Sequence, residues 1–382
     1  MSLKEIENIF SVMADAALHP GKMIKEFKQN TASKVVGCFP YYCPEELVHA
    51  AGMLPIGCWG GQTALALSGY YLPPFACSVM HAGLEFAMSH VYKDLSAVII
   101  PAACDTLKQF GQDWITAAPN IPAAYVVYPL HKTPAGVEYL TGEFTRIREW
   151  VETLAGEKIP DESIHHSIQI YNENKDAMRE FVQAAAEYPD IVTPLKRHSV
   201  FKSRFFMEKS QHTALVKKLV TLLNANPRQE WQGKKVILSG IMLESKSLLE
   251  IFNQYNIAVV GDDLAQESRQ IRAKTPDGKD PVERLAAQWL DMSGCSLVFD
   301  TGNTRAELLI DMAKQYRADG VIFSLMQFCE PEEFDYPIIK RELEKAGIPV
   351  LSFEIEQQMQ SVEQVRTRLQ AFREMLNTRV SE

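Results

Sequence analysis

The stretch "GVIFSLMQFCEPEE", residues 320–333, combines a strand pattern with a cysteine at the point where the strand would end. Residues 321–325 form a continuous apolar run, which is typical of a strand buried on both faces of a parallel sheet. Cys329 follows just beyond this run. A cysteine in such a position can be core filler, a metal ligand or a nucleophile, and its position leaves all three roles open.

Similar apolar runs recur along the second half of the chain, with helical patterns between them. We predict strands at 234–241, 257–263, 295–300, 320–326 and 348–354. Helices are expected between them, for example at 245–255 and 304–318, and a last helix is expected at about 361–376. Strands that alternate with helices predict βαβ units and therefore a parallel sheet.

The first half of the chain shows the same alternation. Runs rich in β-branched and aromatic residues, closed by Gly or Pro, predict strands at 34–40, 54–60, 96–101 and 123–129. Helical spacing of apolar residues appears at 44–51, 78–92 and 106–117. A long helical stretch follows at about 143–225, with an interruption near 188–194.

These patterns predict an α/β fold with two doubly wound (Rossmann/flavodoxin-like) parallel-sheet domains and a helical middle segment. The predicted N-terminal α/β domain spans residues 1–142 and the helical connecting segment spans 143–230. The C-terminal α/β domain is predicted at 231–382. In open sheets of this kind, ligands bind at the carboxyl ends of the strands.

Composition and charge exclude several classes of protein. The 382 residues are 46% hydrophobic and 23% charged, as in an ordinary globular protein, and the formal net charge is −9. Scattered basic residues on an acidic chain argue against nucleic-acid binding. No apolar run reaches 18 residues, and "MSLKEIENIF" (1–10) lacks the apolar region of a signal peptide. We therefore expect a cytoplasmic protein without a membrane span.

The cysteine count agrees with a reducing compartment. Seven cysteines are present, which is an odd number, and no C-x-x-C pair occurs. A complete disulfide framework, a zinc ribbon and a thioredoxin-type motif are therefore not expected. The chain also lacks a Walker A motif and a G-x-G-x-x-G loop, so ATP hydrolysis or NAD binding by those devices is not expected.

Three of the cysteines lie at the ends of predicted elements. Cys104 and Cys329 each follow a predicted strand, and Cys77 opens a predicted helix, where free N–H groups and the helix dipole favour a thiolate. The other four have a simpler interpretation as packing residues: Cys38, Cys58 and Cys295 in or beside apolar runs, and Cys43 at a helix start.

A shared metal site for Cys77, Cys104 and Cys329 is one interpretation, and incidental thiols at strand exits are the other. Three cysteines without a matching histidine do not complete a closed zinc site, which needs four ligands. Thiolates suit iron–sulfur clusters, and three of them would leave one iron open. The two-domain plan would place such a cluster between the sheets.

Charged residues offer weaker candidates. "GDDLAQESRQIR" (261–272), which includes Arg269, can be a solvated helix start or a strand-exit cluster whose arginines meet phosphate or carboxylate. Glu45 and Glu46 can be acids favoured by a helix dipole or carboxylates of a cleft. We expect His49 and His81, each alone on a predicted helix, to be packing or surface residues.

Several longer motifs resemble a known family. The stretches are "CFPYYCPEELVHAAGMLPIGCWGGQ" (38–62), "YLPPFACSVM" (71–80), "VIIPAACDTLK" (98–108), "DDLAQESRQIR" (262–272) and "MQFCEPEEFDYP" (326–337). They resemble the β-type subunit of 2-hydroxyacyl-CoA dehydratases, which belong to the 2-hydroxyglutaryl-CoA dehydratase and benzoyl-CoA reductase family. The resemblance extends nearly from end to end. These are iron–sulfur enzymes of amino-acid-fermenting anaerobes.

The resemblance implies a heterodimer with an α-type subunit, in which each of the two chains holds one [4Fe–4S] cluster on three cysteines. Here the ligands would be Cys77, Cys104 and Cys329. The implied reaction removes water from an (R)-2-hydroxyacyl-CoA to give the (E)-2-enoyl-CoA through a ketyl radical. A separate ATP-hydrolysing iron–sulfur activator would supply the electron. The acyl-CoA substrate would meet the cluster of the partner, so no catalytic residue is assigned in this chain, and Glu330 has no assigned role.

The region "AGMLPIGCWGGQTALAL" (51–67) is nearest to dehydratases of 2-hydroxyisocaproyl-CoA or lactoyl-CoA. An alternative function is the electron-transfer subunit of an ATP-driven reductase of the benzoyl-CoA reductase type. A third possibility is a cluster-free α/β binding protein with incidental thiols.

Overall fold

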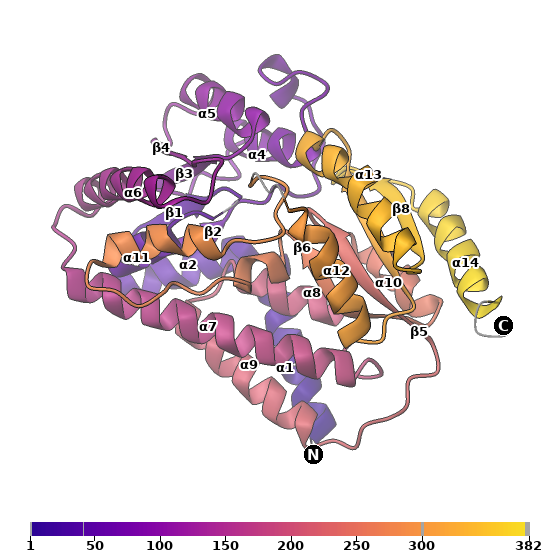
Figure 1. Cartoon of the computed structure of the whole chain (residues 1–382). Coiled ribbons are helices and arrows are strands. Elements are labelled where there is room, and N and C mark those ends of the chain that lie inside the picture. The colour runs from indigo at the N-terminus through magenta and orange to yellow at the C-terminus, as the bar shows by residue number, and fades with distance from the viewer. Residues whose placement is uncertain (1, 41, 299–301, 379–382) are drawn as a thin grey trace.

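The computed structural model describes residues 2–40, 42–298 and 302–378, and its strands form two separate sheets (Figure 1). Both sheets are four-stranded, and every strand pair in them is parallel. The predicted α/β class with two parallel-sheet domains is therefore confirmed.

The first sheet has the strand order β2-β1-β3-β4. Its strands are β1 (Val35–Cys38), β2 (Leu54–Gly57), β3 (Ala97–Ala102) and β4 (Ala123–Val127). Each lies within one predicted run or extends it by a residue. Strands β1, β2 and β3 are buried along their whole length, which explains why they are apolar throughout instead of alternating.

The second sheet repeats this order as β6-β5-β7-β8. Its strands are β5 (Lys234–Gly240), β6 (Ile257–Leu264), β7 (Gly320–Met326) and β8 (Val350–Ile355). In both sheets the strand order reverses beside the first strand, between β1 and β3 and between β5 and β7. A crevice opens at such a switch point, outside the carboxyl ends of the strands.

Gly240 shows how closely β5 and β7 approach at their carboxyl ends. Its φ angle is +141°, and a Cβ atom added there would lie 2.2 Å from the carbonyl oxygen of Ser324. Only glycine fits this position without moving the backbone.

The predicted strand at 295–300 is wrong for the part that is described. Residues 295–298 form a turn in which the Val298 N–H donates to the Cys295 carbonyl at 3.0 Å, and residues 299 and 300 lie outside the described residues. Cys295 and Val298 are nevertheless buried. A short apolar run indicates that its residues are buried, but it does not distinguish a strand from a buried turn. The position beside β5 in the sheet is occupied by β7.

Helices surround the two sheets and form the connections between strands (Figure 1). Those that belong to the first sheet and its surroundings are α2 (Pro20–Thr31), α3 (Glu45–Ala50), α4 (Ser78–Met88), α5 (Asp105–Ala117) and the short 3₁₀ helix η1 (Ser68–Tyr70). Those around the second sheet are α10 (Lys246–Gln254), α12 (Thr304–Gln315), α13 (Glu330–Lys345) and α14 (Glu363–Thr378).

The helical middle consists of α6 (Pro134–Ala155), α7 (Asp161–Glu187), α8 (Pro194–Ser203) and α9 (Lys209–Asn224). The predicted interruption near 188–194 is confirmed, because α7 ends at Glu187 and α8 begins at Pro194. Pro194 is favoured at a helix start, where its missing N–H has no partner to lose.

The N-terminal helix α1 (Ser2–Leu18) packs against α8 and α9, so these elements share a core of their own. Figure 1 shows α1, α7 and α9 side by side at the base of the molecule. Ile6, Phe10, Phe181 and Leu219 are among the residues buried there. The domain limits at 142/143 and 230/231 stay predictions, and the first of them falls inside α6.

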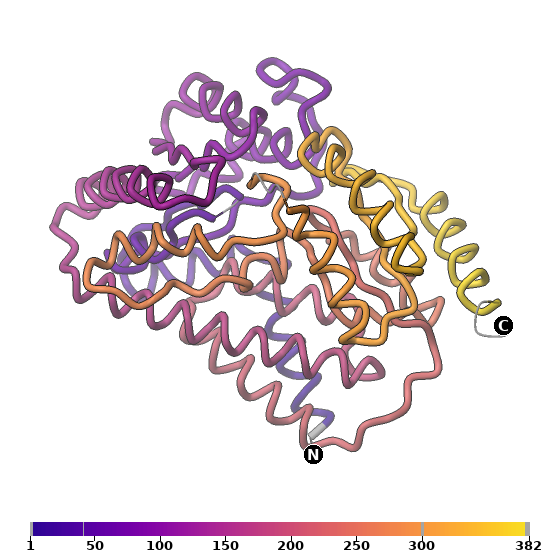
Figure 2. The backbone as a smooth tube through the Cα atoms, viewed as in Figure 1, coloured from indigo at the N-terminus to yellow at the C-terminus, as the bar shows by residue number. Residues whose placement is uncertain are grey.

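One segment of the second half reaches back to the first. The 3₁₀ helix η2 (Ser268–Ile271), α11 (Pro281–Ala287) and the 3₁₀ helix η3 (Gln288–Asp291) follow β6, and α11 packs against α6 and α7. Figure 2 shows this segment in orange, running alongside the long helices of the middle segment.

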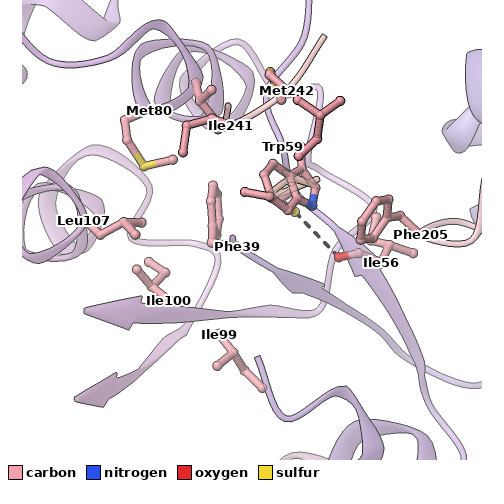
Figure 3. Packing of buried hydrophobic residues seen from close by; sticks show 14 of the residues in the cluster. Phe39, Ile56, Trp59, Met80, Ile99, Ile100, Leu107, Phe205, Ile241 and Met242 are labelled. Carbon is pink, nitrogen blue, oxygen red and sulfur yellow. Dashed lines mark hydrogen bonds between the residues drawn. The ribbon is translucent and has the colours of Figure 1, made fainter. Parts of the chain in front are cut away.

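A single large core connects the two sheets. It includes Phe39 and Ile56 from the first sheet region, Phe205 after α8, and Met242 after β5. Figure 3 shows these residues around Trp59 in one continuous packing arrangement. Burial of this apolar surface is the main force that holds the two sheet regions against each other.

A bilayer-spanning helix needs both sufficient length and an apolar surface. No helix of the described residues meets both requirements.

Candidate functional site

Each of the three predicted ligand cysteines occupies the N-cap position of a helix. Cys77 is the N-cap of α4, Cys104 of α5 and Cys329 of α13. The Leu107 N–H points at the Cys104 sulfur at 3.4 Å. Free N–H groups and the positive end of the helix dipole favour negative charge at an N-cap. The helix starts therefore favour the thiolate form of these cysteines, and burial acts in the opposite direction.

The two sheets place Cys104 and Cys329 in equivalent positions. Cys104 follows β3 and Cys329 follows β7, and each of these strands borders the switch point of its sheet. Cys77 belongs to the connection between β2 and β3. Ser78 at the start of α4 contacts Met326 at the end of β7, so the two halves of the chain meet beside Cys77.

The three thiols lie close enough to influence one another. Burial raises the pKa of Cys77 to about 11, and the charge of a Cys104 thiolate contributes to this rise. Burial also raises the pKa of Cys104. The pKa of Cys329 is raised well above its ordinary value by burial, with further contributions from Glu332, Cys77 and Cys104. Because these pKa values are high, a metal that binds here must displace protons, and its own charge must hold the thiolates.

The chemistry of the three cysteines can be compared with what a cluster needs. Within the described ranges, no three His, Cys, Asp or Glu side chains converge on one point where they could bind a metal ion. All three cysteines are free, partly buried and packed against the large apolar core. Soft, partly shielded sulfur donors of this kind fit an iron–sulfur cluster.

Hydrogen bonds beside Cys77 tie the two halves of the chain together. The hydroxyl of Ser78, the next residue, lies 3.1 Å from the sulfur of Met326 and accepts the Gln357 N–H at 3.0 Å. The side chain of Gln357 in turn donates to the Trp59 carbonyl at 2.7 Å. These hydrogen bonds therefore hold the two halves together beside Cys77. Ser78 lies in the motif at 71–80, which assigned it no role, and Gln357 lies outside the quoted motifs.

The loop before Cys329 has an unusual conformation. Phe328 has a φ angle of +62°, which is rare for a bulky residue, and its N–H donates to the Glu333 carboxylate at 3.1 Å. Strained backbone of this kind concentrates at functional sites. Glu330 begins α13 on the exposed side, whereas Glu332 in the same turn is buried. The acids of "CEPEE" thus start the helix and also hold the loop in place.

The motif at 261–272 is not a solvated helix start. Asp262, Asp263, Glu267 and Arg269 are all buried, and the two aspartates belong to β6 itself. The alternative in which the arginines of this motif meet phosphate or carboxylate is correct in one respect. Arg269 pairs with carboxylates, but they are side chains of this protein and not groups of a ligand. Its side chain lies 3.0 Å from Glu332 and 3.3 Å from Asp263.

Glu45 and Glu46 combine both alternatives considered for them. They occupy the first turn of α3, and they pair with buried lysines, Glu45 with Lys209 at 3.2 Å and Glu46 with Lys175 at 3.9 Å. Together they line a small cavity of about 60 Å³. Burial acts against the charge of Glu45, but attraction to Lys209 and Arg204 outweighs it and lowers the pKa of this carboxyl.

The remaining cysteines have the predicted packing role. Cys38, Cys58 and Cys295 are buried in the core, and Cys43 lies two residues before α3.

Both histidines hold neighbouring structure through hydrogen bonds and do not meet a ligand set. His49 contacts the Ser167 hydroxyl at 3.0 Å, and His81 contacts the Ser68 hydroxyl and the Pro73 carbonyl at 3.1 Å each.

A cleft of about 460 Å³ is lined by residues of both sheet regions, but none of the three cysteines is among them. Its walls come from the carboxyl ends of β2, β7 and β8 and from α1, α2 and α8. Met326 contributes to this wall and lies three residues before Cys329. The volume is in the range of pockets that hold small molecules.

The fold and the site define a class: a two-domain α/β protein in which cysteines from both parallel-sheet regions occupy helix starts at the boundary between them. Comparison with known proteins makes this more specific. Residues 40–376 match the family described as 2-hydroxyglutaryl-CoA dehydratase, D-component. The chain belongs to this family, as its motifs predicted.

Known relatives span nearly the whole chain. It is 45% identical to the beta subunit of lactoyl-CoA dehydratase from Anaerotignum propionicum, over 98% of this chain and 100% of the relative. It is 41% identical to the (R)-phenyllactyl-CoA dehydratase beta subunit of Clostridium sporogenes, over 97% and 99% of the two chains. A benzoyl-CoA reductase subunit of Thauera aromatica is 23% identical, over 89% of this chain and 90% of the relative.

Proposed function

We propose that this chain is the β-type subunit of a heterodimeric 2-hydroxyacyl-CoA dehydratase, a hydro-lyase, and that Cys77, Cys104 and Cys329 hold its [4Fe–4S] cluster. The observation that carries the proposal is the set of three N-cap cysteines, contributed by both sheet regions of a chain that matches dehydratase β subunits from end to end. The names of the relatives support the proposed substrate class, an (R)-2-hydroxyacyl-CoA.

In the proposed reaction, hydroxide leaves C2 and a proton leaves C3, which gives the (E)-2-enoyl-CoA and one water. The C3 proton is barely acidic in the substrate, because the thioester carbonyl acidifies protons on C2 and not on C3. One electron from a separate ATP-dependent activator would convert the thioester to a ketyl radical anion, from which hydroxide can leave. The electron returns after the proton is lost, so it is needed only catalytically.

When bound, a cluster on three cysteines supplies one-electron transfer and one iron without a protein thiolate. The residues of this chain provide its environment. The three helix N-termini direct N–H groups and positive dipole ends at the thiolates. The apolar core behind them limits access of water, and the Ser78 and Gln357 hydrogen bonds fix the two halves of the site against each other.

The partners proposed are an α-type dehydratase subunit, which would bind the acyl-CoA, and an ATP-hydrolysing iron–sulfur activator. Names of the relatives as beta subunits support a partner subunit. We propose the cytoplasm as the location, since free thiols stay reduced there.

Anaerobic iron and sulfide analysis tests the cluster. The wild-type chain should contain iron and acid-labile sulfide, and the serine variant of each of the three cysteines should lose most of both. Cys43→Ser is the matched control, because Cys43 is also partly buried near a helix start but does not occupy an N-cap beside the others. A colourless, iron-free wild-type protein, or iron that survives in all three variants, would refute the proposed site.

Turnover tests the reaction. The chain is combined with its α-type partner, the activator, ATP and a strong reductant, and 2-hydroxyacyl-CoA substrates with short apolar acyl groups are supplied. We expect the 2-enoyl-CoA in large excess over the electrons consumed. A lack of turnover on every 2-hydroxyacyl-CoA would contradict the dehydratase proposal.

The alternative is an electron-transfer subunit of an ATP-driven reductase. A relative named as a benzoyl-CoA reductase subunit supports it, but at 23% identity against 45% for the lactoyl-CoA dehydratase subunit. The same assay separates the two, because a reductase consumes electrons in proportion to its product.

A further inference from the structure

A buried network of charges lies directly behind the first turn of α13. The guanidinium group of Arg305 contacts Glu332 at 2.7 Å and Asp263 at 2.8 Å. Arg269 contacts the same two carboxylates, at 3.0 Å and 3.3 Å. All four side chains are at most 3% exposed. Two arginines and two carboxylates thus form a closed ring inside the protein.

A third arginine joins this network. The guanidinium group of Arg272 contacts Asp263 at 2.6 Å, and its side chain is 17% exposed. Burial acts against the charge of Asp263, but attraction to the three arginines outweighs it and holds the pKa of this carboxyl below its usual range. Asp335 also approaches Arg305, at 3.5 Å, but it is 39% exposed and screened by water.

A second network provides a natural comparison. Asp262, the neighbour of Asp263 in β6, pairs with Arg197, which also pairs with Glu267. Successive residues of a strand point to opposite faces of the sheet, so the Asp262 pair lies on the face opposite the Asp263 network. Arg197 is as deeply buried as Arg305. Similar chemistry is thus present on both faces of one strand, but only one face borders α13.

Glu332 connects the first network to the cysteine site. It lies three residues after Cys329, and its N–H donates to the Cys329 carbonyl at 3.0 Å. The Ser296 hydroxyl donates to the same carboxylate at 2.8 Å. The arginines therefore hold the carboxylate of a residue in the turn that presents Cys329.

A buried ion network is seldom the most stable way to fill a core, because apolar residues of the same size often do as well or better. A network beside a candidate redox site has another use. Three cysteine thiolates bring negative charge into a low-dielectric region, and each added electron increases it. Nearby fixed cations lower the free energy of the reduced state, and charge and hydrogen bonding around a cluster are among the factors that set its potential.

We propose that the network of Asp263, Arg269, Arg305 and Glu332 sets the reduction potential of the group held by Cys77, Cys104 and Cys329, with Glu332 also positioning Cys329. This proposal rests on the proposed function, since it requires a cluster at the three cysteines. Arg305 and Arg269 are positioning residues in it, because they act through Glu332 and through their charge.

The test measures the potential of this cluster alone. The full chain is loaded with ⁵⁷Fe, combined anaerobically with its unlabelled partner subunit, and titrated against redox mediators while Mössbauer spectra are recorded. Arg305→Gln removes a cation, so the ratio of reduced to oxidised cluster at fixed potential should fall about tenfold or more. Tenfold is about 59 mV for a one-electron couple.

Glu332→Gln removes an anion and should shift the ratio in the opposite direction. In the double variant with Arg305→Gln and Glu332→Gln, the ratio of reduced to oxidised cluster should return toward the wild-type value. Because this variant removes both partners of one ion pair, it also covers the case in which a single variant fails to fold. Arg305→Lys keeps the charge and should stay within threefold of the wild type. Arg197→Gln is the matched control, which should lower stability but leave the potential unchanged.

The decisive result is a shift of the reduction potential in opposite directions in Arg305→Gln and Glu332→Gln. General loosening of the site would shift the potential of both variants in the same direction. Shifts of the same sign, no shift in either variant, or an equal shift in Arg197→Gln would overturn the inference. Iron analysis of the wild type precedes the titration. An iron-free wild type therefore counts against the proposed function, whereas a normal cluster with unmoved potentials counts against the network alone.

Discussion

His212 illustrates how neighbouring hydrogen bonds determine the protonation state of a buried side chain. Its Nε2 lies 3.0 Å from the Val200 carbonyl, which requires a proton on that nitrogen. Its Nδ1 faces the amide nitrogen of Asn174 at 3.0 Å, and the Asn174 oxygen is occupied by Arg204 at 2.7 Å. Nδ1 must therefore accept a hydrogen bond, and the imidazole is neutral.

Acid should destabilise the protein through this residue. Burial, together with the charges of Lys209 and Arg204, lowers the pKa of His212 to about 3. The unfolded chain has a histidine pKa of about 6.5, so between about pH 6.5 and 3 it binds one more proton than the folded chain. The contribution of His212 to the free energy of unfolding is then lost as pH falls, by at most about 1.4 kcal/mol per pH unit.

Urea unfolding of the metal-free chain between about pH 4.5 and 7.5 measures this dependence. His212→Gln should flatten the slope below about pH 6.5, whereas His166→Gln, at an exposed position of α7, should leave it unchanged. Equal slopes in the wild type and His212→Gln would show that His212 is not the group responsible.

At the same scale, the ion-pair partners of Asp262 and Asp263 could not be predicted from the sequence. The motif at 261–272 was expected either in solvent or beside a cleft, because adjacent acids are seldom fully buried. Their actual partners, Arg197 and Arg305, lie more than 40 residues away in the sequence. Local patterns cannot anticipate ion pairs that depend on the tertiary fold, and Arg305 was therefore not among the predicted residues.

At the scale of elements, the strands were predictable because burial on both faces leaves a continuous apolar run. The buried positions of β5 and β7 follow that pattern in the same way as the runs of β1 and β3. The exception, 295–298, is also largely apolar and buried at both ends but is not hydrogen-bonded into a sheet. A short apolar run indicates that its residues are buried, but it does not indicate whether they pair with a neighbouring strand.

Helix starts were harder to predict where the cap is not of the usual type. Glu208 caps α9, and its carboxylate accepts the N–H groups of Ser210 at 3.0 Å and Gln211 at 2.9 Å. Ser, Thr, Asp and Asn are the usual N-cap residues, so a glutamate gives no sequence signal. Cysteine is likewise not among the usual N-cap residues, so Cys77, Cys104 and Cys329 give no N-cap signal for α4, α5 and α13.

The Glu208 cap should contribute to stability in a pH-dependent way. Burial acts against its charge, but a hydrogen bond from His49 and the two backbone N–H groups outweigh it and lower its pKa to about 2. Glu208→Ala should lower the free energy of unfolding by about 1 kcal/mol at pH 7. This contribution is present above the unfolded pKa of about 4.5 and is lost as pH falls toward about 2.

Thermal or urea unfolding of wild type and Glu208→Ala, at about pH 7 and about pH 3, measures the difference. The gap between the two proteins should narrow at the lower pH. Glu187→Ala, at the end of α7 and without a cap role, serves as the control. A gap of equal size at both pH values would show that the Glu208 carboxylate does not act as a charged cap.

At the scale of the whole molecule, the sequence predicted two α/β regions and the three cysteines that lie where they meet, because strand ends and helix starts are local features. The way in which the halves lock together was not predictable. The α11 segment that reaches back to α6, and the packing of α1 on α8 and α9, depend on contacts between residues far apart in the chain. The predicted domain limits rest on the order of elements along the chain, and they stay predictions.

Gln357 connects the two halves of the chain through buried side-chain hydrogen bonds. Its side chain donates to the Trp59 carbonyl at 2.7 Å and to Glu244 at 2.8 Å, and it accepts the Gly61 N–H at 3.1 Å. Gln357 is 5% exposed, so water cannot replace these bonds without entering the core. Truncation leaves buried donors and acceptors without partners, which costs about 1–3 kcal/mol for each group.

We therefore expect Gln357→Ala to lower the free energy of unfolding by about 3 kcal/mol. It should also speed hydrogen exchange of the Gly61 amide by at least about tenfold, because that N–H loses its acceptor and the halves of the chain can separate more easily. Gln360→Ala, at an exposed position three residues later, should change neither quantity. A stability loss below about 0.5 kcal/mol with unchanged exchange at Gly61 would mean that apolar packing around Trp59 holds the halves together without this residue.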